Sequence, residues 1–225
     1  MYQKIDSKSL NLFLKVRKSL LSNNSTIEIS DFGAGSKIFK DNKRTIAQLV
    51  KNVSISPQKA KILFKIIHYF QPKNILELGT CLGLGTYTMH LASKNANIET
   101  VEGCENLALL SQQFFTANNC KTIKVQQQIF SNYFKNLSPL DIYDAVLIDG
   151  NHSYKATLEY FYALIPHLHN DSLLIFDDIH WSKEMNQAWN EIIKNKWVTV
   201  SIDFFYFGLI FIRKEQNKQH FILRT

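Results

Sequence analysis

Residues 74–86 read NILELGTCLGLGT, an apolar run followed by a turn that contains three glycines. The run predicts a short buried strand, and the residues after the turn have the apolar spacing of a helix. Glycines at such a turn let the chain bend sharply and let a ligand approach the backbone, because no Cβ atom stands in the way. The segment predicts the first strand–turn–helix unit of a nucleotide-binding α/β sheet. The alternative is an ordinary turn that holds three glycines.

The chain after this unit continues to alternate between strand and helix patterns, which predicts parallel pairing with helices on both faces of the sheet. Its end differs, because the apolar runs 198–205 and 207–213 are almost adjacent and predict an antiparallel pair. We therefore expect an α/β, Rossmann-like, doubly wound and mostly parallel seven-stranded sheet that ends in this C-terminal hairpin. The expected parallel strands cover residues 74–78, 98–101, 123–127, 143–148 and 173–176.

Residues 1–55 precede the alternating part and predict an N-terminal helical and lid extension. Amphipathic spacing over 7–21 predicts a helix that packs on the domain. Residues 31–41 read DFGAGSKIFKD, break the helical pattern and form a candidate lid loop. Because no linker-like composition separates this extension from 56–225, we expect a single domain over 1–225 with a Rossmann-like core.

The composition limits the classes of partner. The chain of 225 residues carries 26 Lys and Arg against 19 Asp and Glu, a net charge of +7. These basic residues are scattered, which favours a solvated surface over a nucleic-acid partner. Three cysteines without a CxxC pair argue against a zinc site and for a reducing compartment. With neither a signal-peptide pattern nor an apolar run of the ~20 residues that span a bilayer, we expect a cytoplasmic protein without a membrane partner.

The glycine spacing and its acidic neighbour predict the ligand. The order GxxxGxG differs from the GxGxxG of dinucleotide-binding turns. Glu77 stands two positions before the first glycine, where a carboxylate suits the ammonium group of a cationic sulfonium ligand. We therefore predict S-adenosylmethionine rather than NAD. The cofactor-binding residues predicted in this segment are Glu77, Gly79, Thr80, Gly83, Gly85 and Thr86.

The ends of the next two strands supply further candidates. Glu102 ends the second strand, where an acidic side chain can accept both ribose hydroxyls; the alternative is a solvated loop carboxylate. Gln127 or Gln128, after the third strand, are candidates for hydrogen bonds to the adenine edge.

The motifs ILELGTCLGLGT, VEG, YDAVLIDGNHSY and LLIFDDIHW together resemble class I S-adenosylmethionine-dependent methyltransferases. Within these, residues 55–213 are similar to the catechol and caffeoyl-CoA type of metal-dependent O-methyltransferases and their bacterial relatives. In that family three oxygen ligands hold Mg²⁺, and the resemblance assigns them to Asp149, which also borders the cofactor, Asp177 and Asp178. Carboxylate oxygens suit Mg²⁺, Mn²⁺ or Ca²⁺. The alternative is that these aspartates cap turns or helices.

Two histidines accompany these aspartates. The family commonly has a lysine as general base three residues after the first metal aspartate, where this chain has His152. A histidine, with an ordinary pKa of about 6.5, accepts a hydroxyl proton near neutral pH without being desolvated first. His180, two residues after the aspartate pair, is the second candidate for a base or ligand. The resemblance thus implies methyl transfer to a hydroxyl group of a small molecule, with a divalent metal and a histidine base, and suggests a homodimer.

Three alternatives remain open at this point. The first is metal-independent transfer that uses His152 and His180 as bases. The second is nucleic-acid methylation, which the positive charge suggests, although the chain has no Asn-Pro-Pro-Tyr type of motif and no appended recognition module. The third is a non-catalytic binding protein that keeps the fold.

Overall fold

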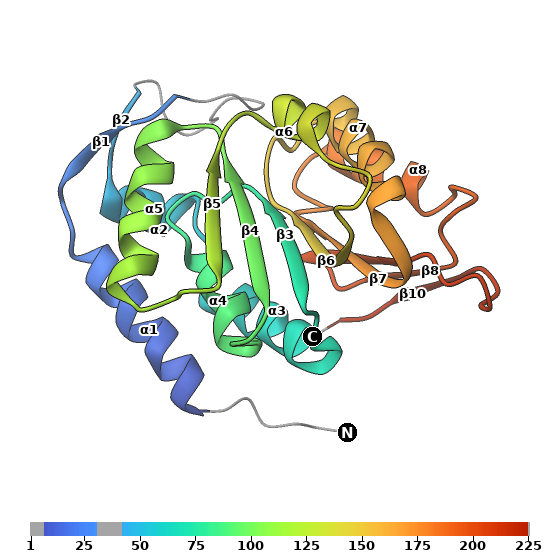
Figure 1. Ribbon diagram of the computed structural model, residues 1–225, viewed down its shortest axis with the longest axis horizontal. Helices are drawn as coiled ribbons and strands as arrows, with labels where there is room; N and C mark the ends of the chain where they lie inside the picture. The colour runs from blue at the N-terminus through green and yellow to red at the C-terminus, as the bar shows by residue number, and fades with distance from the viewer. Residues whose placement is uncertain (1–6, 31–41, 225) are drawn as a thin grey trace.

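The computed structural model describes residues 7–30 and 42–224. Its main sheet has eight strands in the order β10-β8-β9-β7-β6-β3-β4-β5 (Figure 1). Strands β3 to β7 are all parallel, and β9 pairs antiparallel with both β7 and β8. The bounds are β3 Asn74–Leu78, β4 Asn97–Glu102, β5 Ile123–Gln127, β6 Tyr143–Ile148, β7 Leu168–Asp177, β8 Val200–Asp203, β9 Phe207–Phe211 and β10 Gln219–Ile222.

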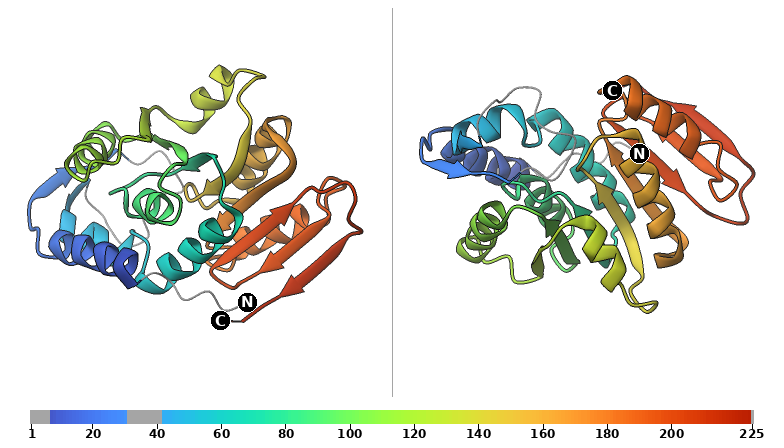
Figure 2. Two further views of the ribbon diagram at one scale, coloured as in Figure 1. Left: turned by 60° about the horizontal axis from the view of Figure 1, so that its bottom comes forward. Right: turned by 90° about the horizontal axis from the view of Figure 1, so that it is seen from above.

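Helices cover both faces of this sheet, as Figure 2 shows. On one face α2 to α5 pack on a core that includes Ile75, Leu147 and Ile175. On the other, α6 to α8 pack on a core that includes Leu76 and Val146. Neighbouring strand residues thus point to opposite faces, as the two-residue period of a strand requires. The bounds are α2 Ile46–Asn52, α3 Pro57–Phe70, α4 Leu84–Ala92, α5 Glu105–Ala117, α6 Phe130–Asn136, α7 Tyr154–Leu164 and α8 Lys183–Ile192.

The order of the strands creates one reversal point. From β3 the chain moves outward through β4 to β5, and it then returns to β6 on the other side of β3. In open α/β sheets the crevice beyond the carboxyl ends of the strands at such a point is where ligands bind. The carboxyl ends of β3 and β6 are therefore the place to look for a site.

The expected fold class is confirmed, with one correction to the number of strands. The sheet has eight strands instead of seven, because β10 adds to the edge by pairing parallel with β8. All four residues of β10 are exposed. The strand therefore lacks the alternation between buried and exposed positions by which a sequence reveals a strand.

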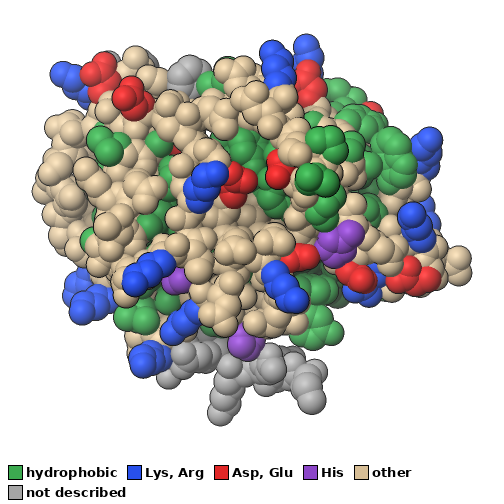
Figure 3. Space-filling view, viewed as in Figure 1, with side chains coloured by type: hydrophobic (Ala, Val, Ile, Leu, Met, Phe, Trp, Pro, Cys, Tyr) green, Lys and Arg blue, Asp and Glu red, His purple; other side chains and the backbone are tan. Residues whose placement is uncertain are grey.

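The N-terminal extension contains more than helices. Helix α1 spans Ser7–Leu21 as expected, but β1 Thr26–Glu28 and β2 Lys43–Thr45 form a small antiparallel pair. The candidate lid at 31–41 lies outside the described residues. No helix within the described residues is long and apolar enough to cross a membrane. On the face drawn in Figure 3, the Lys and Arg side chains stand singly or in small groups, some of them beside acidic side chains and others not.

Candidate functional site

A cavity of about 600 Å³ lies at the reversal point of the sheet. Its wall is built largely from the turns that follow β3, β4, β6 and β7, together with residues 29, 30, 44, 49 and 52–55 of the N-terminal part. Of the residues singled out from the sequence, the wall contains Glu77, Gly79, Thr80, Gly85, Glu102, Asp149, His152, Asp177 and Asp178. The parallel sheet thus brings strand ends that are a hundred residues apart in the sequence to one surface.

Several turns at this edge hold an unusual backbone conformation. Gly79 and Gly83 have φ angles of 106° and 76°. Three residues with side chains, Cys81 after β3, Asn151 after β6 and Asp178 after β7, also have positive φ angles of 49°, 48° and 54°. Such angles are uncommon for L-residues, and they are found more often at functional sites.

Glu77 lies at the bottom of the cavity and is only 1% exposed. Its carboxylate accepts hydrogen bonds from the hydroxyl groups of Thr86 and Thr100, the latter at 2.6 Å. Burial raises the pKa of Glu77 to about 7, although these hydrogen bonds act to lower it. A cationic group beside Glu77 would favour its ionised form. The ammonium group of a ligand would supply such a positive charge.

Glu102 lies beside this turn and is held by backbone groups. It accepts hydrogen bonds from the N–H of Cys81 at 2.8 Å and from the N–H of Cys104 at 2.9 Å. Burial raises the pKa of Glu102, while these backbone bonds act to lower it. Each carboxylate oxygen has a second lone pair, so Glu102 can accept further bonds from a ligand hydroxyl.

Four predicted cofactor residues do not line the cavity. Thr86 instead donates a hydrogen bond to Glu77, and Gly83 is the N-cap residue of α4. Gln127 is exposed and donates to the carbonyl of Gly103 at 3.3 Å. In place of Gln127 and Gln128, the wall is formed by residues 129–131, IFS, at the start of α6. That helix was not expected from the sequence, so these residues were missed.

The acidic cluster lies at the ends of β6 and β7. Burial raises the pKa of Asp149 to about 6. Burial, followed by the charge of Asp149, raises the pKa of Asp177 well above its ordinary range. One oxygen of Asp177, Oδ1, is buried without a hydrogen-bond donor.

A lysine that the sequence analysis left without a role completes this cluster. Lys59 Nζ lies 2.5 Å from Asp177 Oδ2 and 3.0 Å from Asp178 Oδ1. It comes from the first turn of α3, more than a hundred residues earlier in the chain, and no local pattern distinguishes it from the other lysines of that helix.

These carboxylates, as they are arranged, do not fit a divalent ion. Asp177 and Asp178 each already give an oxygen to the Lys59 ammonium. Within 7–30 and 42–224, no three Asp, Glu, His or Cys side chains form a group that could hold a metal. The divalent metal that the family resemblance implies therefore has no ready-made site among the described residues.

His152 lies in the wall of the cavity and faces the acidic cluster. Its Nε2 lies 3.6 Å from Asp149 Oδ1, and its ring packs against Trp181 with the ring centres 5.8 Å apart. Because Nε2 is the ring nitrogen that approaches Asp149, Nδ1 is the nitrogen left to accept a proton from another group.

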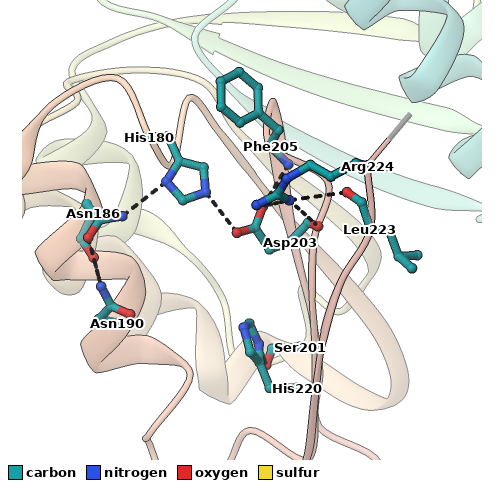
Figure 4. A network of polar contacts seen from close by, with 9 residues as sticks. All are labelled: His180, Asn186, Asn190, Ser201, Asp203, Phe205, His220, Leu223 and Arg224. Carbon is teal, nitrogen blue, oxygen red and sulfur yellow. Dashed lines mark hydrogen bonds and ion pairs between the residues drawn. The ribbon is translucent and has the colours of Figure 1, made fainter.

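His180 lies elsewhere, outside the cavity wall, and both of its ring nitrogens have partners (Figure 4). Nε2 lies 2.8 Å from Asp203 Oδ2, and Nδ1 lies 3.0 Å from the side-chain amide of Asn186. The ring also stacks on Phe205. The structure therefore does not bring His180 together with His152.

Comparisons with known proteins identify the fold. Residues 76–179, which span the cavity-forming strand ends from β3 to β7, match the family model described as a methyltransferase domain. The chain has the class I methyltransferase fold.

Three solved structures share this methyltransferase fold. An O-methyltransferase from Bacillus cereus in complex with S-adenosylhomocysteine is 16% identical, with a TM-score of 0.63 over 95% of this chain and 93% of that one. The O-methyltransferase TomG from Streptomyces achromogenes, in complex with S-adenosylmethionine and involved in tomaymycin synthesis, is 14% identical, with a TM-score of 0.61 over 72% and 82%. A candidate caffeoyl-CoA O-methyltransferase from Staphylococcus aureus is 19% identical, with a TM-score of 0.63 over 72% and 87%.

Proposed function

We propose that this protein transfers the methyl group of S-adenosylmethionine to a hydroxyl oxygen of a small molecule. The observation that carries the proposal is that one cavity is lined by both Glu77 and Glu102 and by the His152–Asp149 pair. The known complexes of similar folds with S-adenosylmethionine and S-adenosylhomocysteine support the identity of the cofactor.

Each group has a role that its surroundings permit. When bound, S-adenosylmethionine supplies an electrophilic methyl group. Glu77 binds the ammonium group and Glu102 the ribose hydroxyls. His152 accepts the proton of the acceptor hydroxyl at Nδ1, and Asp149 stabilises the imidazolium that results. The acceptor oxygen then forms a bond to the methyl carbon as the carbon–sulfur bond breaks, which leaves a neutral thioether.

The remaining expectations belong to this proposal as well. A cavity of about 600 Å³ has the size of small-molecule sites, which favours a small hydroxylated acceptor over a nucleic acid. We keep the cytoplasmic location and the homodimer as predictions. His152 is retained as the proposed base, and His180 is set aside because its ring nitrogens are engaged outside the cavity.

The first test is calorimetric titration of the protein with S-adenosylhomocysteine, once in the presence of Mg²⁺ and once in the presence of EDTA. We expect binding close to one to one. The Glu102→Gln variant should bind roughly 10- to 100-fold more weakly, the equivalent of one or two charge-assisted hydrogen bonds. Glu105→Gln, a change of an exposed glutamate three residues later, is the matched control and should bind like the wild type. Absence of binding by the folded wild type would refute the proposal.

The acceptor is sought separately, by following transfer of a labelled methyl group to a panel of hydroxylated small molecules. Incorporation into an acceptor amine or into RNA, with no transfer to any hydroxyl compound, would reject O-methylation while it leaves the cofactor assignment intact.

A further inference from the structure

Lys59 lies in the first turn of α3, directly behind the acidic edge of the cavity. Helix α3 begins at Pro57, and Ser56 caps it by accepting a hydrogen bond from the backbone N–H of Lys59 at 3.3 Å. The Lys59 side chain is 13% exposed, and its Nζ lies 5.5 Å from the ring centre of Phe207. The first turn of a capped helix and an aromatic ring thus hold the ammonium group in place.

The ammonium group bridges two consecutive carboxylates. Its partners are Asp177, whose side chain is 5% exposed, and Asp178, whose side chain is 34% exposed. Both aspartates belong to the cavity wall, whereas Lys59 does not. Among the described residues, Lys59 is the ion-pair partner of both aspartates. A buried carboxylate needs a compensating positive charge, and here a side chain supplies it.

We propose that the Lys59 ammonium is the resident cation of this acidic cluster, in the place that a divalent metal would take, and that methyl transfer proceeds without a metal. A metal ion needs several oxygens that converge on it, and two of the three candidate ligands direct an oxygen to Nζ. A divalent ion close to a fixed ammonium would also be repelled by it.

Lys59 acts on the reaction through other residues, so it is a positioning residue. It orients the Asp177–Asp178 turn and neutralises part of the negative charge there. Asp149, which adjoins Asp177, then faces His152 across 3.6 Å as its partner. This part of the inference rests on the proposed function, whereas the cation-binding property of the cluster does not.

The experiment is calorimetric titration of Mg²⁺ and of Mn²⁺ into the full chain, for the wild type, Lys59→Met, Lys59→Arg and Lys61→Met. Lys61 is an exposed lysine two residues further along α3, so Lys61→Met controls for the loss of one positive charge from the helix. We expect no saturable binding to the wild type, Lys59→Arg or Lys61→Met. Lys59→Met should gain a divalent-cation site at least about tenfold tighter than any binding by the wild type, because the oxygens lose their internal cation.

Stoichiometric Mg²⁺ binding by the wild type would overturn the inference, and so would a folded Lys59→Met variant that gains no site. Folding is checked by circular dichroism, and Lys59→Gln replaces Lys59→Met where the latter does not fold. Titration with S-adenosylhomocysteine on the same samples separates the two proposals. If the wild type does not bind S-adenosylhomocysteine, only the proposed function is contradicted. If the wild type binds Mg²⁺ or Mn²⁺ saturably, only the role of Lys59 is contradicted.

Discussion

Gly79 and Asp149 lie so close together that a Cβ atom added at Gly79 would be 2.0 Å from the carbonyl oxygen of Asp149. The proposed cofactor turn after β3 therefore rests directly on the turn after β6 that carries the proposed base. The contact is between backbone atoms, which cannot move aside as a flexible side chain would. The two turns are thus coupled through a position that tolerates only glycine.

We predict that Gly79→Ala abolishes nucleotide binding and lowers stability by several kcal/mol, through the steric overlap and the φ angle of 106°. Calorimetry and thermal melting provide the measurements. Gly85→Ala is the comparison, because its added Cβ would meet only the end of the Glu77 side chain, at 2.9 Å. If the two variants lost equal stability, the backbone contact would not be the cause.

The stability of the ligand-free protein should depend on pH through Glu77. Its pKa in the folded protein, about 7, lies above the ordinary value of 4.5. The stabilising contribution of the protonated carboxyl is therefore fully present below pH 4.5 and is lost as the pH rises through about 7. Urea unfolding from pH 4.5 to 8 should show this loss, of roughly 3 kcal/mol at most, in the wild type relative to Glu77→Gln. Parallel pH profiles for the two proteins would contradict it.

The two histidines should behave differently on substitution. His152→Gln should lower kcat by roughly 10²- to 10⁴-fold, as expected for loss of a general base, with little change in the affinity for S-adenosylhomocysteine. His180→Gln should leave kcat near that of the wild type. It should lower the melting temperature, by roughly 2–4 °C for each 1 kcal/mol by which the free energy of unfolding falls. The opposite pattern would exchange the roles that we assign.

Asp203 should stabilise the C-terminal edge of the sheet. It accepts from the backbone N–H of Phe205 at 2.7 Å and contacts His180 and Arg224 (Figure 4). Burial alone would raise the pKa of Asp203, but these partners together lower it. The stability that they confer is present above pH 3.8 and is lost as the pH falls through the lowered pKa.

The corresponding variant, Asp203→Asn, should lower the melting temperature at pH 7, and its difference from the wild type should shrink near pH 3. Asp171→Asn is the matched control. It removes an ion pair with Arg213 in which the aspartate is 65% exposed, and exposed pairs contribute about 0–1 kcal/mol. Hydrogen exchange in β10 should be faster in Asp203→Asn alone. Equal effects of the two substitutions would show that the contacts of Asp203 stabilise the protein no more than an exposed ion pair does.

The sequence by itself determined the fold class, because its signals are local. The apolar run and glycines of 74–86 already indicate a strand, a sharp turn and a helix, and β6, β7 and β9 contain similar apolar runs. The fully exposed strand β10 could not be predicted in this way. It forms by pairing with β8, at a sheet edge that exists only after the chain has folded.

The sequence also determined which strand ends carry acidic side chains, and a parallel sheet places such ends along one edge. Only the tertiary structure decided what stands beside them. Lys59 reaches Asp177 across 118 positions of the chain, and His180 turns toward Asp203 instead of the cavity. Both outcomes depend on how α3 and the C-terminal strands pack on the sheet. Contacts between distant segments leave no periodicity or spacing in the sequence from which they could be predicted.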